Sequence, residues 1–267
     1  MKNNKIKNQL IKDQYKDDKN LNSRLNLHSY NINKIDWNDW CFNQMDFPNK
    51  ARILELGCGP GGLWERNKYK LNKDWNITLS DFSKGMLECA KNTLEQVDYD
   101  FKYKEIDIQD IPYEDGSFDV VIARHMLYHV PDIEKALSEI KRVLATGGTF
   151  YATTNGRGAM AELYELIEKF DPEIGLNNLG MGERFEFENG KLLLEKCFSE
   201  VKMQVFEGKI VVPLAEPIVS YVASTMRGSA ILVGQKKQEF TKYVEDYIKE
   251  KGSMAITTKS CIFKVKK

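Results

Sequence analysis

The stretch Ile53–Trp64 reads ILELGCGPGGLW, and it decides how the fold of this chain is predicted. A short apolar run ends there in four glycines, Gly57, Gly59, Gly61 and Gly62. Glycine has no Cβ, so such a loop can adopt positive φ and let the backbone approach a ligand closely. A buried strand that leads through a loop of this kind into a helix is a common way to bind a nucleotide. We therefore predict a nucleotide-binding loop.

The glycines fit two different spacings. Gly57-x-Gly59-x-x-Gly62 satisfies the dinucleotide-binding fingerprint, which would suit NAD. The alternative spacing, Glu55-x-Gly57-x-Gly59-x-Gly61, belongs to another class of nucleotide-binding protein. Glycines alone do not decide between them, so the choice depends on residues farther along the chain.

The composition limits the kind of protein. The 267 residues suit one sizeable α/β domain, and 39 basic and 39 acidic residues give a formal net charge of zero. Zero net charge argues against a nucleic-acid partner, because neutralising phosphates usually takes a basic face. The sequence contains no long apolar run typical of a membrane span, and its start lacks the apolar core of a secretory signal. Five scattered cysteines without a C-x-x-C motif predict reduced thiols in a cytoplasmic protein.

Strand-like and helix-like segments alternate after the glycine loop. The apolar patterns predict strands over residues 76–80, 99–106, 118–123 and 149–153, and helices from Ser83 and over residues 133–144. Gly147 and Gly148 are expected to end the second of these helices. Such alternation predicts a Rossmann-like α/β fold with a doubly wound, mostly parallel sheet.

The segments on either side of this core are less regular. Before it, an aromatic-rich stretch that includes Trp37 and Trp40 predicts a helical cap whose tryptophans pack in the core. After it, we predict helices over 159–170 and 191–198, β segments over 201–212 and 255–265, and helices between those β segments at 216–225 and 238–249. Within a single domain we therefore expect an N-terminal helical cap or lid (1–47), a cofactor-binding core (48–155) and a part that completes the sheet with substrate-side helical inserts (156–267).

Two aspartates follow the predicted strands. Asp81 ends the second strand, where a carboxylate can accept hydrogen bonds from both ribose hydroxyls of a nucleotide or can simply cap the next helix. Asp107 ends the third strand, where it could accept from an adenine amino group while Ile106 and Ile108 pack against the ring.

Taken in order, these features resemble the class I S-adenosylmethionine-dependent methyltransferases across roughly Arg52–Thr154. The resemblance is specific to the small-molecule branch that includes the ubiquinone and menaquinone methyltransferases. Its motifs here are ELGCGPG, Asp81, IDIQDIPYEDGSFD, FDVVIARHMLYHVPD and RVLATGG. The family's usual K-P-G-G is A-T-G-G in this chain, and its first acid, often Asp, is Glu55. The resemblance implies about seven strands, mostly parallel, with an antiparallel last strand.

The resemblance also implies S-adenosylmethionine as the cofactor and S-adenosylhomocysteine as its product. The residues expected to bind it are Glu55, Gly57, Cys58, Gly59, Gly61, Asp81, Phe82, Asp107, Ile108 and Arg124, together with Tyr15 and Arg24 from the cap. Two of these have plain alternatives, since Cys58 could be a small buried side chain and Arg124 a surface charge. Gly62 is assigned to helix packing.

Methyl transfer from a sulfonium is an in-line displacement on an already activated donor. The protein then acts mainly by positioning, and it needs a general base only if the acceptor must lose a proton. His125 is the best candidate for that base, although it could instead line the cofactor, and Tyr128 could orient the acceptor through its hydroxyl.

Seven further residues are expected to border the acceptor. They are His28, Tyr30, His129, Asn155, Arg157, Met160 and Tyr221. His129 has an alternative role in supporting its own loop. We expect no metal and no nucleic-acid or membrane partner, and either a monomer or a homodimer.

The sequence therefore predicts transfer of a methyl group to a small-molecule acceptor. An RNA or protein methyltransferase is the first alternative, although the chain has no N-P-P-Y-type motif after the fourth strand. An NAD-dependent oxidoreductase would need a Tyr and Lys proton-donor arrangement that the sequence does not suggest, and a non-catalytic S-adenosylmethionine binder stays open. The sequence does not identify the acceptor or the methylated atom.

Overall fold

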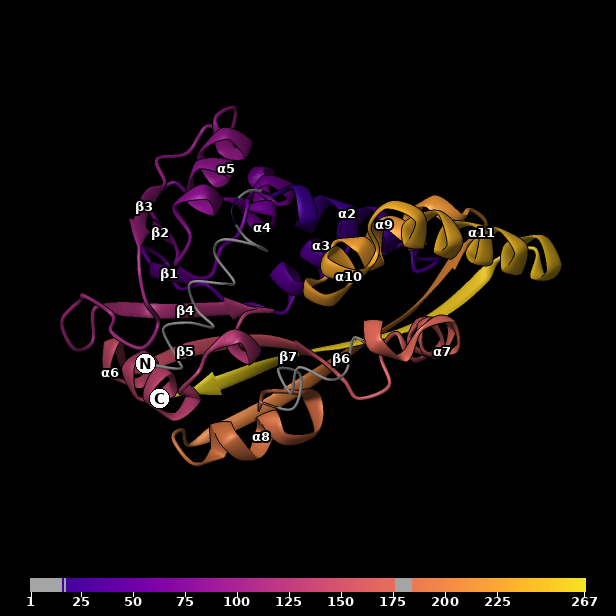
Figure 1. The fold of residues 1–267 in the computed structure, drawn as a ribbon. Helices are drawn as coiled ribbons and strands as arrows, with labels where there is room; N and C mark the ends of the chain where they lie inside the picture. The colour runs from indigo at the N-terminus through magenta and orange to yellow at the C-terminus, as the bar shows by residue number, and fades with distance from the viewer. Residues whose placement is uncertain (1–15, 17, 176–183) are drawn as a thin grey trace. The chain divides into compact units, whose positions relative to one another are not determined.

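The computed structural model describes residue 16 and residues 18–175 and 184–267 (Figure 1). The chain forms two compact units. The sheet unit comprises Ile35–Arg157, Met181–Phe206 and Ser260–Lys267, and the helical unit comprises Met1–Lys34, Gly158–Gly180 and Glu207–Lys259.

The described residues form one seven-stranded sheet in the order β3-β2-β1-β4-β5-β7-β6. Its strands are β1 (Arg52–Leu56), β2 (Asn76–Asp81), β3 (Lys102–Glu105), β4 (Phe118–Arg124), β5 (Leu144–Asn155), β6 (Glu200–Val212) and β7 (Met254–Lys266). Strands β3, β2, β1, β4 and β5 pair in parallel, and β7 pairs antiparallel with β5. The predicted Rossmann-like sheet, mostly parallel with an antiparallel strand late in the chain, is confirmed.

Helices cover both faces of the parallel strands (Figure 1). The helices α3 (Trp37–Asn43), α4 (Gly62–Arg66) and α5 (Lys84–Leu94) lie on one face, and α6 (Ile133–Val143) and α8 (Phe187–Glu195) lie on the other. Each face of the sheet has its own hydrophobic core, and neighbouring residues of β1 point to opposite faces. Ile53 packs in the core under α3, α4 and α5, and Leu54 packs in the core under α6 and α8. Burial on both faces explains why β1 and β4 are nearly continuous apolar runs.

Three predicted boundaries were wrong by a few residues. Helix α6 ends at Val143, and β5 begins at once with Leu144, which pairs with Phe118, rather than after the two glycines. Helix α8 begins four residues earlier than predicted, where the side chain of Asn189 accepts from the backbone N–H of Glu186 and caps the first turn. Strand β3 is shorter than the predicted 99–106 segment.

The helical unit has a hydrophobic core of its own. It contains α2 (Lys19–His28), α7 (Ala161–Phe170), α9 (Ala215–Ala223), α10 (Met226–Ile231), α11 (Gly234–Lys251) and a short 3₁₀ turn, η4 (Pro172–Ile174). Leu27, Leu163, Ile218 and Phe240 are fully buried in this core. The two helices predicted between the last β segments correspond to α9 and α11, with α10 between them.

The predicted cap, residues 1–47, does not fall into one unit. Helix α2 belongs to the helical unit and α3 to the sheet unit. The role of 1–47 as a lid stays a prediction. Among the described helices, none is both long and apolar enough to cross a lipid bilayer.

Candidate active site

The glycine loop joins β1 to α4 and has the backbone conformation that its sequence predicts. Gly57, Gly59 and Gly61 have φ angles of 69°, 55° and 80°, a left-handed region that favours glycine. A Cβ on Gly57 would lie 2.9 Å from Cγ of Met126, so packing excludes a side chain there as well. Gly62 is the first residue of α4, as expected from its assignment to the helix.

Asp81 lies at the end of β2 and bonds directly to this loop. Its Oδ2 accepts from the backbone N–H of Gly59 at 3.0 Å, and its Oδ1 accepts from that of Ser83 at 2.8 Å. Burial raises the pKa of Asp81, and these backbone donors act against that rise. The hydroxyl of Ser83 caps α5, so Asp81 is not the helix cap and can accept further hydrogen bonds.

Asp107 and Ile108 lie after β3. The carboxylate of Asp107 accepts from the backbone and side-chain amides of Gln109 at 3.1 and 3.2 Å. Ile106 and Ile108 are 4% and 6% exposed and pack in the core that contains α6. The adenine-binding role of Asp107 and Ile108 stays a prediction.

Glu55 and Arg124, both predicted to bind the cofactor, bond to each other. Glu55 is fully buried, with Oε1 accepting from Nε of Arg124 at 3.1 Å and Oε2 accepting from the indole N–H of Trp64 at 2.6 Å. Burial raises the pKa of Glu55, and Arg124 and Trp64 act against that rise. A terminal nitrogen of Arg124 also donates to Oδ1 of Asn38 at 2.8 Å.

Asn38 is a contact of this site that was not predicted. It belongs to none of the family's motifs, and only the parallel pairing of β1 with β4 could have suggested that Glu55 and Arg124 meet. Arg124 is not the surface charge that its alternative interpretation proposed, because its side chain is 10% exposed.

His125 follows β4 in a strained conformation. Its φ of 49° is unusual for a residue with a side chain, and its backbone N–H donates to the carbonyl and the hydroxyl of Thr153 at 3.1 and 3.0 Å. Its ring lies 5.2 Å from that of Trp37, which stacks on Trp40. Strain of this kind is concentrated at functional sites, so the conformation supports a functional role for His125.

Tyr128 and His129 share a 3₁₀ turn, η3 (Leu127–His129), a few residues after His125. Their rings are 4.5 Å apart in an edge-on arrangement. The structure therefore gathers three predicted site residues in the short segment 125–129 after β4.

Other predicted residues of the sheet unit have partners within it. Asn155 ends β5 and accepts from the hydroxyl of Ser260 at 2.8 Å, and Arg157 forms an ion pair with Glu186 at 3.1 Å. Their roles at the acceptor stay predictions. Cys58 is 4% exposed and burial raises the pKa of its thiol, which matches the interpretation as a small buried side chain. Phe82 is partly exposed beside Asp81.

The remaining predicted residues belong to the helical unit. The rings of His28 and Tyr221 are 6.4 Å apart, and Tyr30 packs against the core of this unit. Met160 is 6% exposed in the same core and precedes α7 with a φ of 65°, so the structure gives it a packing role. Arg24 donates to the carbonyl of Asn20 within α2 at 3.2 Å. Tyr15 lies outside the described residues.

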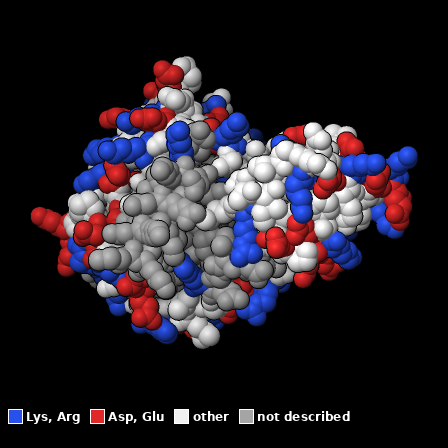
Figure 2. All heavy atoms as spheres, in the orientation of Figure 1, with Lys and Arg blue, Asp and Glu red and all other residues white. Residues whose placement is uncertain are grey.

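One open hollow among the described residues lies away from the glycine loop. This hollow of about 800 Å³ lies at the amino ends of β2 and β3, beside Asn76 and Lys102, whereas the glycine loop follows the carboxyl end of β1. Over the described part of the face drawn in Figure 2, basic and acidic side chains alternate. The site is recognised by the glycine loop and Asp81.

Comparison with known proteins identifies the same region. Residues 54–152 match a family model described as a methyltransferase domain. The ubiquinone biosynthesis O-methyltransferase of Dechloromonas aromatica is 29% identical over 142 residues, which are 53% of this chain and 58% of that enzyme. The chain therefore spans a little over half the length of this relative.

Solved structures share the fold. A Bacillus halodurans protein matches with a TM-score of 0.61 and 16% identity over 86% of this chain and 98% of that one. A Haemonchus contortus phosphoethanolamine N-methyltransferase, solved with S-adenosylmethionine, matches with a TM-score of 0.54 and 17% identity over 91% of this chain and 56% of that one. At these identities the likeness shows the fold alone. Together, the comparisons show a chain whose residues 54–152 are similar to a methyltransferase domain and whose fold is shared with solved methyltransferases.

Proposed function

We propose that this chain is an enzyme that transfers a methyl group from S-adenosylmethionine to a small-molecule acceptor. The observation that carries the proposal is the hydrogen bond from Gly59 to Asp81. It joins the glycine loop to the carboxylate at the end of β2, the two features to which the resemblance assigns the cofactor.

The residues present suit this cofactor. Three glycines keep side chains off the loop backbone, and the carboxylate of Asp81 has lone pairs left for ribose hydroxyls. S-adenosylmethionine held there would supply an activated methyl group for the electron pair of the acceptor, and the electrons of the broken carbon–sulfur bond would stay with S-adenosylhomocysteine. The chain's own groups position the acceptor, and His125 takes a proton at an imidazole nitrogen if the acceptor carries one.

A small acceptor is the substrate class that we favour. The relative from Dechloromonas aromatica is named for ubiquinone biosynthesis, which supports a small organic acceptor here. Five free cysteines suit a reducing compartment, so we place the protein in the cytoplasm. The NAD-dependent oxidoreductase is not favoured, since the family match is to methyltransferases.

Two measurements test the proposal. Calorimetry should detect binding of S-adenosylmethionine and S-adenosylhomocysteine but not of NAD. A screen of a metabolite library that detects S-adenosylhomocysteine should then find a methylated product. Binding of NAD alone would contradict the cofactor. Turnover only with RNA or protein would contradict the acceptor class, and binding without any turnover would favour a non-catalytic binder.

A further inference from the structure

One buried ion pair connects three segments at the carboxyl edge of the sheet. Glu55 lies two residues before Gly57 in β1, and Arg124 immediately precedes the strained His125. From Arg124 a second hydrogen bond leads to Asn38 in α3. The guanidinium of Arg124 therefore contacts both the strand that leads into the glycine loop and α3. Arg124 itself directly precedes the candidate base in the chain.

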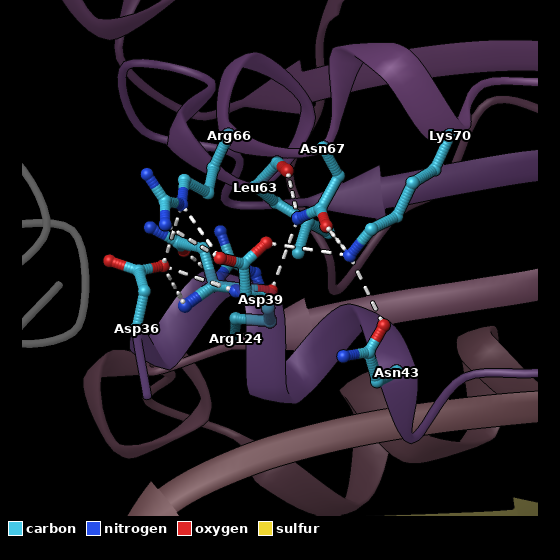
Figure 3. A network of polar contacts seen from close by, with 9 residues as sticks. Asp36, Asp39, Asn43, Leu63, Arg66, Asn67, Lys70 and Arg124 are labelled. Atoms are coloured by element: carbon cyan, nitrogen blue, oxygen red, sulfur yellow. Dashed lines mark hydrogen bonds and ion pairs between the residues drawn. The ribbon is translucent and has the colours of Figure 1, made fainter. Parts of the chain in front are cut away.

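Helix α3 is joined by further polar contacts to α4 and to the residues that follow it (Figure 3). Asp39 forms ion pairs with Arg66 at 2.8 Å and with Lys70 at 3.4 Å. Asn67 is 1% exposed and donates both to the carbonyl of Asn38 at 3.2 Å and to that of Leu63 at 2.9 Å. Because α4 begins directly after the glycine loop, a shift of α3 would move the end of that loop.

The buried pair is better explained by orientation than by stability. The desolvation cost of a buried ion pair offsets much of its attraction, and apolar residues of similar size often stabilise a fold as well. Such a pair instead fixes the relative orientation of the groups that it joins, because the donors of the guanidinium lie in a fixed planar arrangement. Here Nε donates to Glu55 and a terminal nitrogen donates to Asn38.

We propose that Arg124 is a positioning residue for cofactor binding. Through Glu55 it fixes the strand that leads into the glycine loop, and through Asn38 it fixes α3 against the helix that follows the loop. The loop is thereby held in the conformation in which Gly59 meets Asp81. This inference rests on the proposed function for its effect on S-adenosylmethionine, but the order of the loop can be measured without any ligand.

The test compares Arg124→Lys with a matched control. Lysine keeps the charge but cannot meet Glu55 and Asn38 in the same planar arrangement. The control is Arg52→Lys, because Arg52 pairs with Asp119 at 2.7 Å and also joins β1 to β4, near the opposite ends of these strands. We expect Arg124→Lys to raise the Kd for S-adenosylmethionine roughly tenfold, and Arg52→Lys to leave it within about twofold of wild type.

Hydrogen exchange of the ligand-free protein gives the second readout. The amides of Cys58, Gly59 and Gly61 bond to Ser80, Asp81 and Cys58. A peptide over residues 57–64 should exchange several-fold faster in Arg124→Lys than in wild type, and at the wild-type rate in Arg52→Lys. Asn38→Ala, which leaves the Glu55 pair in place, should shift both readouts in the same direction by a smaller factor. If Arg124→Lys does not fold, Asn38→Ala alone tests the positioning role.

The outcomes separate this inference from the proposed function. Unchanged exchange and affinity in Arg124→Lys and Asn38→Ala, or an equal change in Arg52→Lys, would overturn the positioning role. A wild-type protein that does not bind S-adenosylmethionine would overturn the proposed function instead, and the exchange comparison would still decide whether Arg124 orders the loop.

Discussion

The Oδ2 atom of Asp81 lies 3.0 Å from the backbone nitrogen of Gly59, which donates a hydrogen bond to it. The two residues are 22 positions apart, and they meet because β1 and β2 are parallel neighbours whose carboxyl ends share one edge of the sheet. The contact selects the loop conformation and orients the carboxylate at the same time.

Asp81→Asn should weaken binding of S-adenosylmethionine. The substitution keeps the shape but removes the charge, and hydrogen bonds to a charged group contribute about 1.5 to 3 kcal/mol, which corresponds to a Kd raised by roughly tenfold or more. Calorimetry measures the change. Glu105→Gln is the matched control, since Glu105 is the register partner of Asp81 at the end of β3 and forms an ion pair with Lys84. Equal losses in both variants would contradict a direct role for Asp81.

Gly57→Ala should destabilise the fold more than Gly147→Ala. Both glycines have positive φ, at 69° and 75°, so each substitution carries a backbone cost of about 1 to 2 kcal/mol. Only at Gly57 would the added Cβ also overlap Met126, because nothing lies within 4 Å at Gly147. Urea unfolding measures the difference. The double variant Gly57→Ala/Met126→Ala tests the overlap. Once the stability loss of Met126→Ala alone is subtracted, it should recover most of the extra loss that Gly57→Ala shows over Gly147→Ala. No such recovery would show that the overlap with Met126 is relieved in another way.

Glu139→Gln should lower stability at neutral pH but not in acid. Glu139 accepts from Arg142 at 2.8 Å and from the backbone N–H of Ile111 at 2.9 Å, and Arg142 holds its pKa below the usual range. A lowered folded-state pKa means that the stabilisation is present above the pKa of the unfolded chain and disappears as the pH falls through the folded value. We expect Glu139→Gln to lower the free energy of unfolding by about 1 to 2 kcal/mol near pH 7. The effect is no larger because solvent screens this partly exposed ion pair.

The measurement is urea unfolding of wild type and Glu139→Gln at neutral pH and again well below the usual pKa of a glutamate. Glu134→Gln is the control, because Glu134 lies on the same helix and forms an exposed ion pair with Lys196. A difference between wild type and Glu139→Gln that persists undiminished in acid would rule out the ionised pair as its cause.

The sequence predicts local features of the fold better than contacts between distant segments. Apolar runs such as Phe118–Ala123 and the glycine spacing depend on neighbours in the chain, so the parallel sheet and its loop were predictable. The Arg124 contact with Asn38 spans 86 positions and depends on how α3 packs, which no periodicity encodes. For the same reason the sequence does not predict the bond between Glu55 and Arg124, and their contact with the cofactor stays a prediction. The burial of Met160 likewise depends on the packing of the helical unit, and its place at the acceptor stays a prediction.

His125→Asn tests the candidate base on the turn after β4. Asparagine tolerates the left-handed backbone that His125 adopts, so the variant should fold and keep its affinity for S-adenosylmethionine. If His125 removes a proton from the acceptor, turnover of the acceptor found by the metabolite screen should fall by about 10² to 10⁴. The rise of wild-type turnover with pH on the acid side should also disappear, because only the neutral imidazole accepts a proton. His129→Asn, on the same turn, should retain that pH profile. Loss of affinity rather than turnover in His125→Asn would instead show that the imidazole lines the cofactor.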